Sequence, residues 1–169
     1  DRGRDVMLDA IALLKHRGEY AELMIVGASD DEKLICESRC QELNIHDHVV
    51  VVGRVPGVEI PNYIEKADMG ICVWADKPYW RFNPPTKLFE YLVAGLPVLA
   101  NNMVTHTEYI KDDTNGLICD YTAESMANAI AKCLSDRELL KKMRVYVNNN
   151  NTDFLWVNIE KSFIKLLQA

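Results

Sequence analysis

Four polar side chains in the middle of the chain are spaced so that they could bind a phosphorylated ligand together. A helix would place them on one side: Asn83, Thr86, Lys87 and Glu90. The free N–H groups at a helix start, a hydroxyl and an ammonium group attract an anion. Glu90 lies two turns after Asn83, and its side chain leans back toward the N-terminus of the helix. There it could accept hydrogen bonds from hydroxyl groups of the ligand. The pattern therefore favours a phosphate carried by a polyol, although each residue alone is more typical of a solvated helix face.

The limits of this helix are marked by capping residues. Asn83 is a good N-cap, and Pro84 and Pro85 suit the first helical positions. Gly95 can end the helix in a left-handed conformation, and Pro97 prevents its continuation. We expect the opposite face to pack inward through its apolar side chains, Phe89, Leu92, Val93 and Leu96.

The rest of the chain alternates short apolar strands with helices, which predicts an α/β fold. We expect strands over 22–26, 49–52, 69–74, 98–100 and 116–119. We expect helices over 6–16, 32–43, 60–67, 106–111, 123–134, 138–147 and 154–167, with a break over 148–152. This order implies a parallel sheet with helices on both faces. The last helix either packs on this domain or crosses to another one.

Ligands of such sheets bind outside the carboxyl ends of the strands. The segment before Asn83 follows the strand 69–74, so the predicted anion site lies at that edge. Gly53, Arg54 and Val55 follow another strand and should line the same crevice, near a base or a phosphate. Arg2 is a further candidate cation.

Composition and charge narrow the class of protein. The chain has 169 residues, an ordinary domain size, and a formal net charge of −6, which argues against nucleic acid as a partner. No apolar run approaches the roughly 20 residues that span a bilayer. The five cysteines are scattered in apolar segments, which is typical of reduced, buried thiols in a cytosolic protein, and we expect neither a metal nor a cofactor. The chain opens on a helix, so we expect a fragment that lacks the first strand of its domain.

Other common chemistries have little support. There is no Gly-x-Gly-x-x-Gly or Walker motif, and the carboxylates of Asp30 and Asp31 would repel a pyrophosphate at the loop after Gly27. No Ser-His-Asp or reactive-cysteine arrangement is evident, so the catalytic residues are unknown. His106, near Glu108, is expected in a surface turn.

Residues 85–100 resemble the signature of the nucleotide-sugar-dependent glycosyltransferases of family 4, which have the GT-B fold. The resemblance extends over most of the chain. It includes Arg2-Gly3 in place of a family Lys-Gly, and then segments that match the family's spacing: Ile25-Val26-Gly27, Val52-Gly53-Arg54, Ala67-Asp68, Glu108, Asn115-Gly116-Leu117 and Trp156.

This resemblance implies the Rossmann-like C-terminal half of a two-domain enzyme, which binds a UDP- or GDP-sugar. Glu90 would bind the donor ribose, while Thr86, Lys87 and Arg2 would face the diphosphate. Many family members carry a second carboxylate eight residues earlier, where this chain has Phe82; sugar contacts would then come from Arg81, Asn83 or backbone. Such enzymes usually retain anomeric configuration and need no metal, because cations and helix N–H groups stabilise the phosphate leaving group.

The resemblance further implies transfer of a hexose or N-acetylhexosamine to a glycan or lipid-linked acceptor, in bacterial surface polysaccharide (O-antigen or capsule) synthesis. The missing N-terminal domain would hold most of the acceptor site, so this fragment alone should be inactive. We expect a cytoplasmic protein, with the full-length form peripheral at the inner face of the membrane. Two alternatives stay open: a GT-B-type sugar-nucleotide epimerase, and a non-catalytic receiver-like module with Asp30-Asp31 as its acidic cluster.

Overall fold

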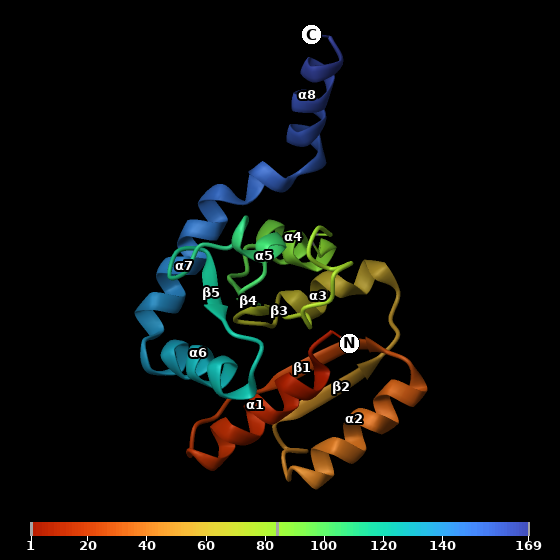
Figure 1. Cartoon of the computed structure of the whole chain (residues 1–169), viewed down its shortest axis with the longest axis vertical. Helices are drawn as coiled ribbons and strands as arrows, with labels where there is room; N and C mark the ends of the chain where they lie inside the picture. Colours follow the sequence, from red (N-terminus) through yellow and green to blue (C-terminus); the bar gives the residue numbers. More distant parts are fainter. Residues whose placement is uncertain (1, 84, 169) are drawn as a thin grey trace.

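The computed structural model describes residues 2–83 and 85–168 and shows an α/β arrangement of parallel strands and helices (Figure 1). The strands are β1 (Leu23–Ala28), β2 (Val49–Gly53), β3 (Gly70–Cys72), β4 (Val98–Asn101) and β5 (Gly116–Cys119). The helices are α1 (Arg4–His16), α2 (Asp30–Glu42), α3 (Ile60–Ile64), α4 (Thr86–Val93), α5 (Val104–Thr107), α6 (Ala123–Ser135), α7 (Arg137–Asn150) and α8 (Trp156–Leu167). Two short 3-10 helices, η1 (Gly57–Glu59) and η2 (Asn151–Phe154), precede α3 and α8. The predicted α/β class with parallel strands is confirmed.

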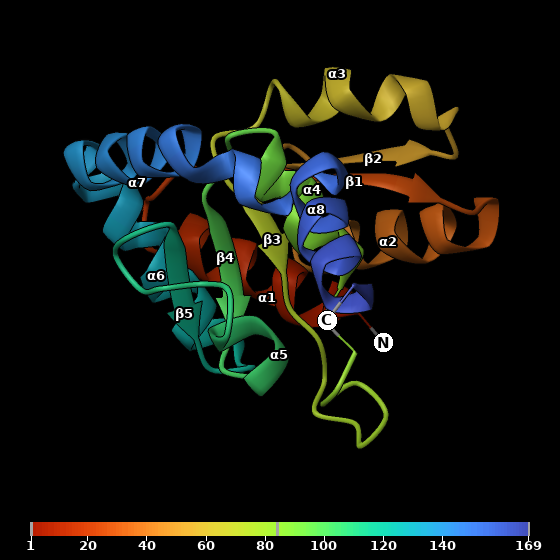
Figure 2. The ribbon, with the colours of Figure 1, turned by 90° about the horizontal axis from the view of Figure 1, so that it is seen from above.

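The strands form two separate parallel sheets. In the first, β1 pairs with β2 and Ile25 lies opposite Val51. In the second, the order is β3-β4-β5, and Leu99 lies between Ile71 and Leu117. Figure 2 shows α2 and α3 on opposite faces of the first sheet. Helices therefore cover both faces, as the alternation of strands and helices predicts.

The central helix α4 ends as predicted but begins later. Gly95 has a φ of 80°, its N–H donates to Leu92 O at 3.0 Å, and the N–H of Leu96 donates to Tyr91 O at 2.9 Å. These two bonds form a Schellman motif. The predicted N-cap, Asn83, is wrong: the N-cap is Pro85, and the N–H of Asn83 donates to Trp80 O within the preceding loop. The predicted role of Pro84 falls outside the described residues.

The inward face of α4 differs slightly from the prediction. Leu92 is buried as expected, but Leu88 is the other fully buried residue of the helix, while Phe89 and Val93 are half-buried. Leu96, just after the helix, is also buried. Leu88 and Leu92 are four residues apart and therefore lie on the same side of the helix. That side faces the second sheet more directly than the side that carries Phe89.

Two predicted boundaries are wrong. The helix expected over 106–111 is α5, which ends at Thr107, because Asn115 Oδ1 accepts a bond from the N–H of Lys111 at 2.6 Å and holds the chain in a turn. The break expected over 148–152 is displaced, since α7 continues to Asn150. The asparagine-rich end of α7 disfavours helix only weakly, and Val147 is anchored in the core.

One core lies between α1, α6, α7 and the strands. Its fully buried members include Leu8, Leu14, Leu99, Met126 and Met143. All five cysteines are free and buried, which confirms the prediction of buried thiols. Removal of apolar side chains from water is the main driving force for folding, so this core supplies most of the stability of the domain.

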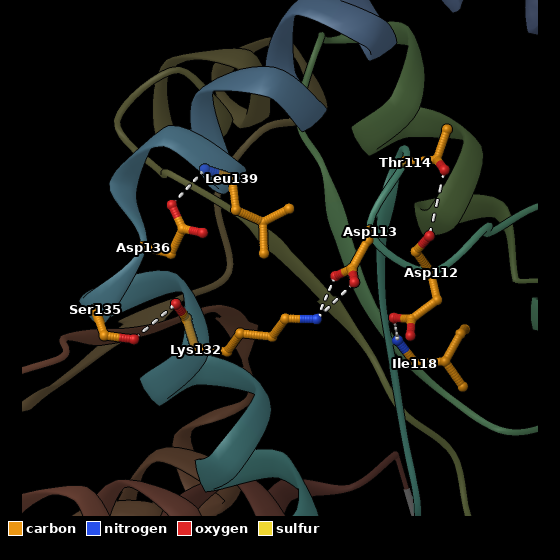
Figure 3. A network of polar contacts seen from close by, with 8 residues as sticks. All are labelled: Asp112, Asp113, Thr114, Ile118, Lys132, Ser135, Asp136 and Leu139. Atoms are coloured by element: carbon orange, nitrogen blue, oxygen red, sulfur yellow. Dashed lines mark hydrogen bonds and ion pairs between the residues drawn. The ribbon is translucent and has the colours of Figure 1, made fainter.

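Polar contacts join the turn before β5 to α6 (Figure 3). Asp113 Oδ2 accepts from Lys132 Nζ at 2.7 Å, and Asp112 Oδ1 accepts from the N–H of Ile118 at 3.0 Å. Asp136 caps α7 by accepting from the N–H of Leu139 at 2.9 Å. The Asp113–Lys132 pair is exposed, so it contributes at most about 1 kcal/mol.

A single methyl group should disrupt the second sheet at Gly116. A Cβ built there would overlap the backbone oxygen of Val98 on β4, which cannot move without breaking the ladder. We expect Gly116→Ala to lower the free energy of unfolding by about 1–3 kcal/mol, as overpacking typically does. Gly57→Ala is the matched control, because a Cβ there meets nothing within 4 Å. Urea denaturation of the two variants measures the difference, and equal stabilities would contradict the prediction.

The last helix, α8, extends away from the body of the molecule (Figure 1). Its apolar side chains are exposed, among them Trp156, Phe163 and Leu166. No helix within residues 2–83 and 85–168 is both long and apolar enough to cross a bilayer.

Candidate functional site

Two helices, α1 and α4, have their N-termini toward the carboxyl edge of β3. Gly3, the N-cap of α1, lies so close to Val73 that a Cβ on it would come within 2.9 Å of the Val73 backbone oxygen. Val73 directly follows β3, and the loop from there leads to α4 (Figure 2). Neither Gly3 nor Pro85 caps its helix with a side chain. The first N–H groups of both helices are therefore available to an anion.

The predicted binding face of α4 is divided in two. Thr86 and Glu90 are exposed and lie four residues apart, so they share the solvent side of the helix. Lys87 is half-buried and lines a cavity together with Tyr91, four residues further on. Tyr91 also packs on Gly70, where a Cβ would meet its ring, and burial raises the pKa of the Tyr91 hydroxyl to about 12. Thr86 and Glu90 thus form the open part of the site, and Lys87 lies on its inner side.

The loop between β3 and α4 is held at its start by a buried asparagine. Asn101 Oδ1 accepts from the N–H of Trp74 at 2.9 Å, and Asn101 Nδ2 donates to Trp74 O at 3.0 Å. The Trp74 ring lies 4.3 Å from the Trp80 ring, centroid to centroid. Sequence reasoning missed Asn101, although a polar residue directly after the apolar run Val98 to Ala100 was a usable signal.

The predicted sugar-contacting residues lie further along this loop. Arg81 donates twice to the carboxylate of Asp76, at 2.7 Å each, so its guanidinium is already paired. Phe82 is 85% exposed, and Asn83 is exposed beside it. The loop therefore presents an aromatic ring, and not a carboxylate, at the position eight residues before Glu90.

The remaining predicted residues lie at neighbouring positions of the same edge. Arg2 is exposed directly before Gly3. Gly53 ends β2, and Arg54, after it, is exposed, while Val55 is half-buried. Arg54 is near enough to help lower the pKa of Glu32, although the Ser29 N–H and hydroxyl are the larger causes. The structure thus gathers the start of α1, the end of β2 and the start of α4 at one edge.

The start of α2, at the same edge, is already capped by hydrogen bonds from its own side chains. Ser29 accepts from the N–H of Glu32, and Glu32 accepts from the N–H of Ser29 at 2.8 Å, a capping box. A carboxylate thus occupies the place where a dinucleotide fold would hold pyrophosphate. This agrees with the prediction that the loop after Gly27 does not bind a dinucleotide.

Two buried polar atoms in the segments that follow β3 and β4 have no hydrogen-bond partner within the described part of the chain. They are Trp80 Nε1, in the loop before α4, and Thr105 Oγ1, on α5. Unsatisfied buried groups are uncommon in folded proteins and often have a functional role.

Cysteine chemistry and metal binding have little support at this edge. Burial raises the pKa of Cys72 and of Cys119 to about 12, so both thiols stay protonated near neutral pH. Within residues 2–83 and 85–168, no three His, Cys, Asp or Glu side chains are grouped so that they could hold a metal ion.

The expectation that His106 lies in a surface turn is wrong. His106 is 0% exposed; its Nδ1 is 3.1 Å from Asn101 O, and its Nε2 is 3.9 Å from Cys72 Sγ. His106 lies within the single turn of α5, and its ring packs edge-on against the Trp74 ring. Burial lowers the pKa of His106 because the charged imidazolium would lose its hydration.

Acidification should therefore destabilise the protein through His106. The unfolded state takes up a proton below its ordinary pKa of about 6.5, while the folded state resists it, so stability is present above that value and is lost as the pH falls. We expect a loss of up to about 1.4 kcal/mol per pH unit, measured by urea denaturation at about pH 7.5 and about pH 5.5. His106→Gln should reduce this pH dependence, whereas His16→Gln, at an exposed position, should leave it unchanged. An unaltered slope in the His106 variant would contradict the assignment.

Comparison with known proteins gives a consistent family. Residues 1–150 match the family model described as glycosyl transferases group 1. YtcC of Bacillus subtilis (strain 168), provisionally named as a glycosyltransferase, is 28% identical over 151 residues, or 84% of this chain and 36% of that protein. The GDP-mannose-dependent alpha-(1-6)-phosphatidylinositol monomannoside mannosyltransferase of Mycobacterium tuberculosis is 26% identical over 140 residues, or 81% of this chain and 36% of that protein. The chain therefore spans just over a third of these relatives.

Solved structures share the fold. Alr3699/HepE of Anabaena, in complex with UDP, superposes with a TM-score of 0.83 at 18% identity, over 99% of this chain and 45% of that one. The C-terminal domain of LpcC, a glycosyl transferase group 1 family protein of Francisella tularensis, gives a TM-score of 0.69 at 21% identity, over 90% of this chain and 77% of that one.

Proposed function

Because this chain belongs to the group 1 glycosyltransferases, we propose that it is the donor-binding, C-terminal domain of a retaining enzyme of family 4. Its ligand is a UDP- or GDP-sugar whose diphosphate lies at the carboxyl edge of β3. Thr86 and the starts of α1 and α4 hold the diphosphate, with Arg2 and Lys87 as the nearby cations. Glu90 accepts hydrogen bonds from the ribose.

One observation supports this proposal most strongly. The uncapped N-termini of α1 and α4 lie at the same edge as the exposed carboxylate of Glu90, in the second turn of α4. Helix N-termini favour anions, and a carboxylate repels them, so the two together suit a ligand with a phosphate end and a hydroxyl end. A nucleoside diphosphate has both. The base lies toward Gly53, Arg54 and Val55.

The chemistry follows from this arrangement. When the bond between sugar and phosphate breaks, negative charge grows on the leaving diphosphate. N–H groups and cations that are already in place stabilise that charge without a metal. The sugar lies toward Arg81 and Phe82, and the unpaired Trp80 Nε1 and Thr105 Oγ1 are further candidate partners for its hydroxyl groups.

The names of similar proteins bear on the donor and the pathway. One relative is GDP-mannose-dependent, and one structural neighbour holds UDP, so both nucleotides remain candidates. We propose that a hexose or N-acetylhexosamine is transferred to a glycan or lipid-linked acceptor in surface polysaccharide synthesis. An N-terminal domain of the same protein would hold the acceptor, and the enzyme would act in the cytoplasm at the inner face of the membrane.

The alternative functions have less support. A sugar-nucleotide epimerase needs a histidine in the crevice. Here His106 is fully buried, His16 lies at the far end of α1, and His46 and His48 precede β2. A receiver-like module needs an acidic cluster that can hold a metal ion, and Asp30 and Asp31, exposed in the first turn of α2, have no third acidic partner of that kind within residues 2–83 and 85–168.

Nucleotide binding tests the proposal directly. We expect UDP or GDP to bind the full-length protein in calorimetry, and to shift the backbone NMR signals of Thr86, Lys87 and Glu90. Magnesium should not be required. No heat and no shifts with either nucleotide would refute the donor-site assignment.

A further inference from the structure

The loop between β3 and α4 carries two aromatic side chains that remain in water. Phe82 is 85% exposed, and Tyr79 is 66% exposed. Both lie in the turns at the tip of the loop, which extends outward from the end of β3, away from the body of the molecule (Figure 2). Folding normally removes large apolar side chains from water, so two rings left exposed at one tip indicate a surface that binds a partner.

Contacts within the loop hold this tip in place. The Trp80 ring lies 4.3 Å from the Trp74 ring and 5.1 Å from the Tyr79 ring, centroid to centroid. The N–H of Trp80 donates to Lys77 O at 2.9 Å, and the N–H of Asn83 donates to Trp80 O at 3.3 Å, so two successive turns are closed. Rings on a loop that is already ordered lose little conformational entropy on binding, and the tip is therefore preorganised.

The tip presents its rings beside a neutralised cation. Arg81 donates two hydrogen bonds to Asp76, at 2.7 Å each. These bonds raise the pKa of Arg81 and lower that of Asp76, so both groups stay charged near neutral pH and pair with each other. The face of an aromatic ring is electrically negative and attracts weakly positive C–H groups, which gather on one face of a pyranose ring. A neutral sugar therefore suits the tip better than a sugar that carries a carboxylate.

We propose that Tyr79 and Phe82 form a subsite for a neutral pyranose ring, which stacks its C–H face on them. The inference rests on the proposed function, because the subsite adjoins the donor site. The order along the chain fits the order of groups in a nucleotide sugar: Glu90 is assigned to the ribose and Thr86 to the diphosphate, and Phe82 comes four residues earlier. The ring belongs either to the donor sugar or to the acceptor sugar, which must approach the same carbon atom.

A membrane surface is the alternative partner for exposed aromatic side chains. Proteins that lie on a bilayer combine such rings with cations that attract anionic lipids. Here Arg81 is paired with Asp76, and Lys77 is not free either. The whole chain has a formal net charge of −6, which opposes binding to an anionic surface. The charges therefore favour a sugar over a lipid headgroup.

The donor source is tested by calorimetry of the full-length protein. The probes are UDP-glucose, UDP-galactose, UDP-N-acetylglucosamine and GDP-mannose, each compared with UDP or GDP alone. We expect Phe82→Ala to weaken the tightest nucleotide sugar by about 3–10-fold and to leave the free nucleotide within about twofold. Phe82→Tyr keeps a ring and should retain the affinity. Tyr20→Ala removes an exposed ring before β1 and is the matched control.

The acceptor source is tested by NMR with UDP or GDP bound. The probes are the methyl glycosides of glucose, galactose, mannose and N-acetylglucosamine. If the ring belongs to the acceptor, nucleotide-sugar affinity will not change in the variants. Saturation transfer from the protein to the C–H protons of the glycosides will then be lost with Tyr79→Ala or Phe82→Ala, and kept with Tyr20→Ala.

Four results would overturn the inference. If UDP or GDP binds normally and neither variant changes the binding of any nucleotide sugar or glycoside, the subsite is wrong and the donor site stands. If no nucleotide binds, the proposed function fails and the subsite fails with it. If UDP-glucuronic acid binds more tightly than UDP-glucose, the sugar is not neutral. If the variants lose only their binding to phosphatidylglycerol vesicles, the rings contact a membrane.

Discussion

Glu90→Ala is expected to weaken UDP or GDP binding by roughly 10–100-fold while leaving the affinity for inorganic pyrophosphate within about twofold. A hydrogen bond to a charged group contributes about 1.5–3 kcal/mol, and each 1.4 kcal/mol is a factor of ten in the dissociation constant. The side chain is exposed, so its removal leaves no cavity. Calorimetry of the full-length protein with each ligand measures the two affinities.

Comparing a nucleoside diphosphate with pyrophosphate distinguishes the loss of a ribose contact from a general weakening of anion binding. Pyrophosphate makes the same diphosphate contacts but has no ribose. Its affinity should therefore respond to Glu90→Ala only through the loss of one nearby negative charge. Glu37→Ala, on the exposed face of α2, removes the same charge elsewhere and is the matched control. Equal weakening of nucleotide and pyrophosphate by Glu90→Ala would refute the ribose role.

Asn101→Leu is expected to lower the free energy of unfolding by roughly 2–5 kcal/mol. The amide of Asn101 is the partner of both the N–H and the C=O of Trp74, at 2.9 and 3.0 Å. Trp74 is 5% exposed, so water cannot replace these bonds. Each buried backbone group left unpaired costs about 1–3 kcal/mol. Urea denaturation at neutral pH measures the loss.

The neighbouring residue is the control for this second prediction. Asn102 is exposed, and Asn102→Leu makes the same chemical change without removing the Trp74 bonds. We also expect Asn101→Leu to loosen the loop that carries Arg81 and Phe82, because Trp74 is its fixed end. Nucleotide affinity should therefore fall with Asn101→Leu and stay unchanged with Asn102→Leu. If Asn101→Leu lowers the free energy of unfolding by less than about 1 kcal/mol, the two bonds from Asn101 to Trp74 do not have the proposed stabilising role.

Periodicity and composition determined the α/β class, most of the element order and the end of α4. These features depend on near neighbours in the chain. A run of apolar residues with a period of two or 3.6 selects strand or helix, and a glycine at the right position ends a helix. The resemblance of residues 85–100 to a family signature added the hypothesis of a donor site, and the family model shows that the chain belongs to the group 1 glycosyltransferases.

The start of α4 shows where local reasoning fails. Asn83 is a good N-cap in isolation, but α4 begins only at Thr86, and Asn83 belongs to the preceding loop, where its N–H donates to Trp80 O. That loop closes through the contact of the Trp74 and Trp80 rings and the Asp76–Arg81 pair. His106 shows the same limit, because its polarity suggests the surface while the tertiary fold buries it beside Trp74 and Cys72. Contacts between residues far apart in sequence decide both outcomes.

The sequence by itself determined that Thr86, Lys87 and Glu90 lie on one helix at the carboxyl edge of a parallel sheet, because helical spacing and strand order suffice for that. Only the tertiary structure decided that Lys87 lines the cavity while Thr86 and Glu90 face solvent, and that Asn101 holds the loop before α4. It also decided that the strands of the described residues, 2–83 and 85–168, pair into two sheets. The physical reason is that side-chain direction, burial and strand pairing depend on what packs from other elements, and spacing along one element carries no information about those partners.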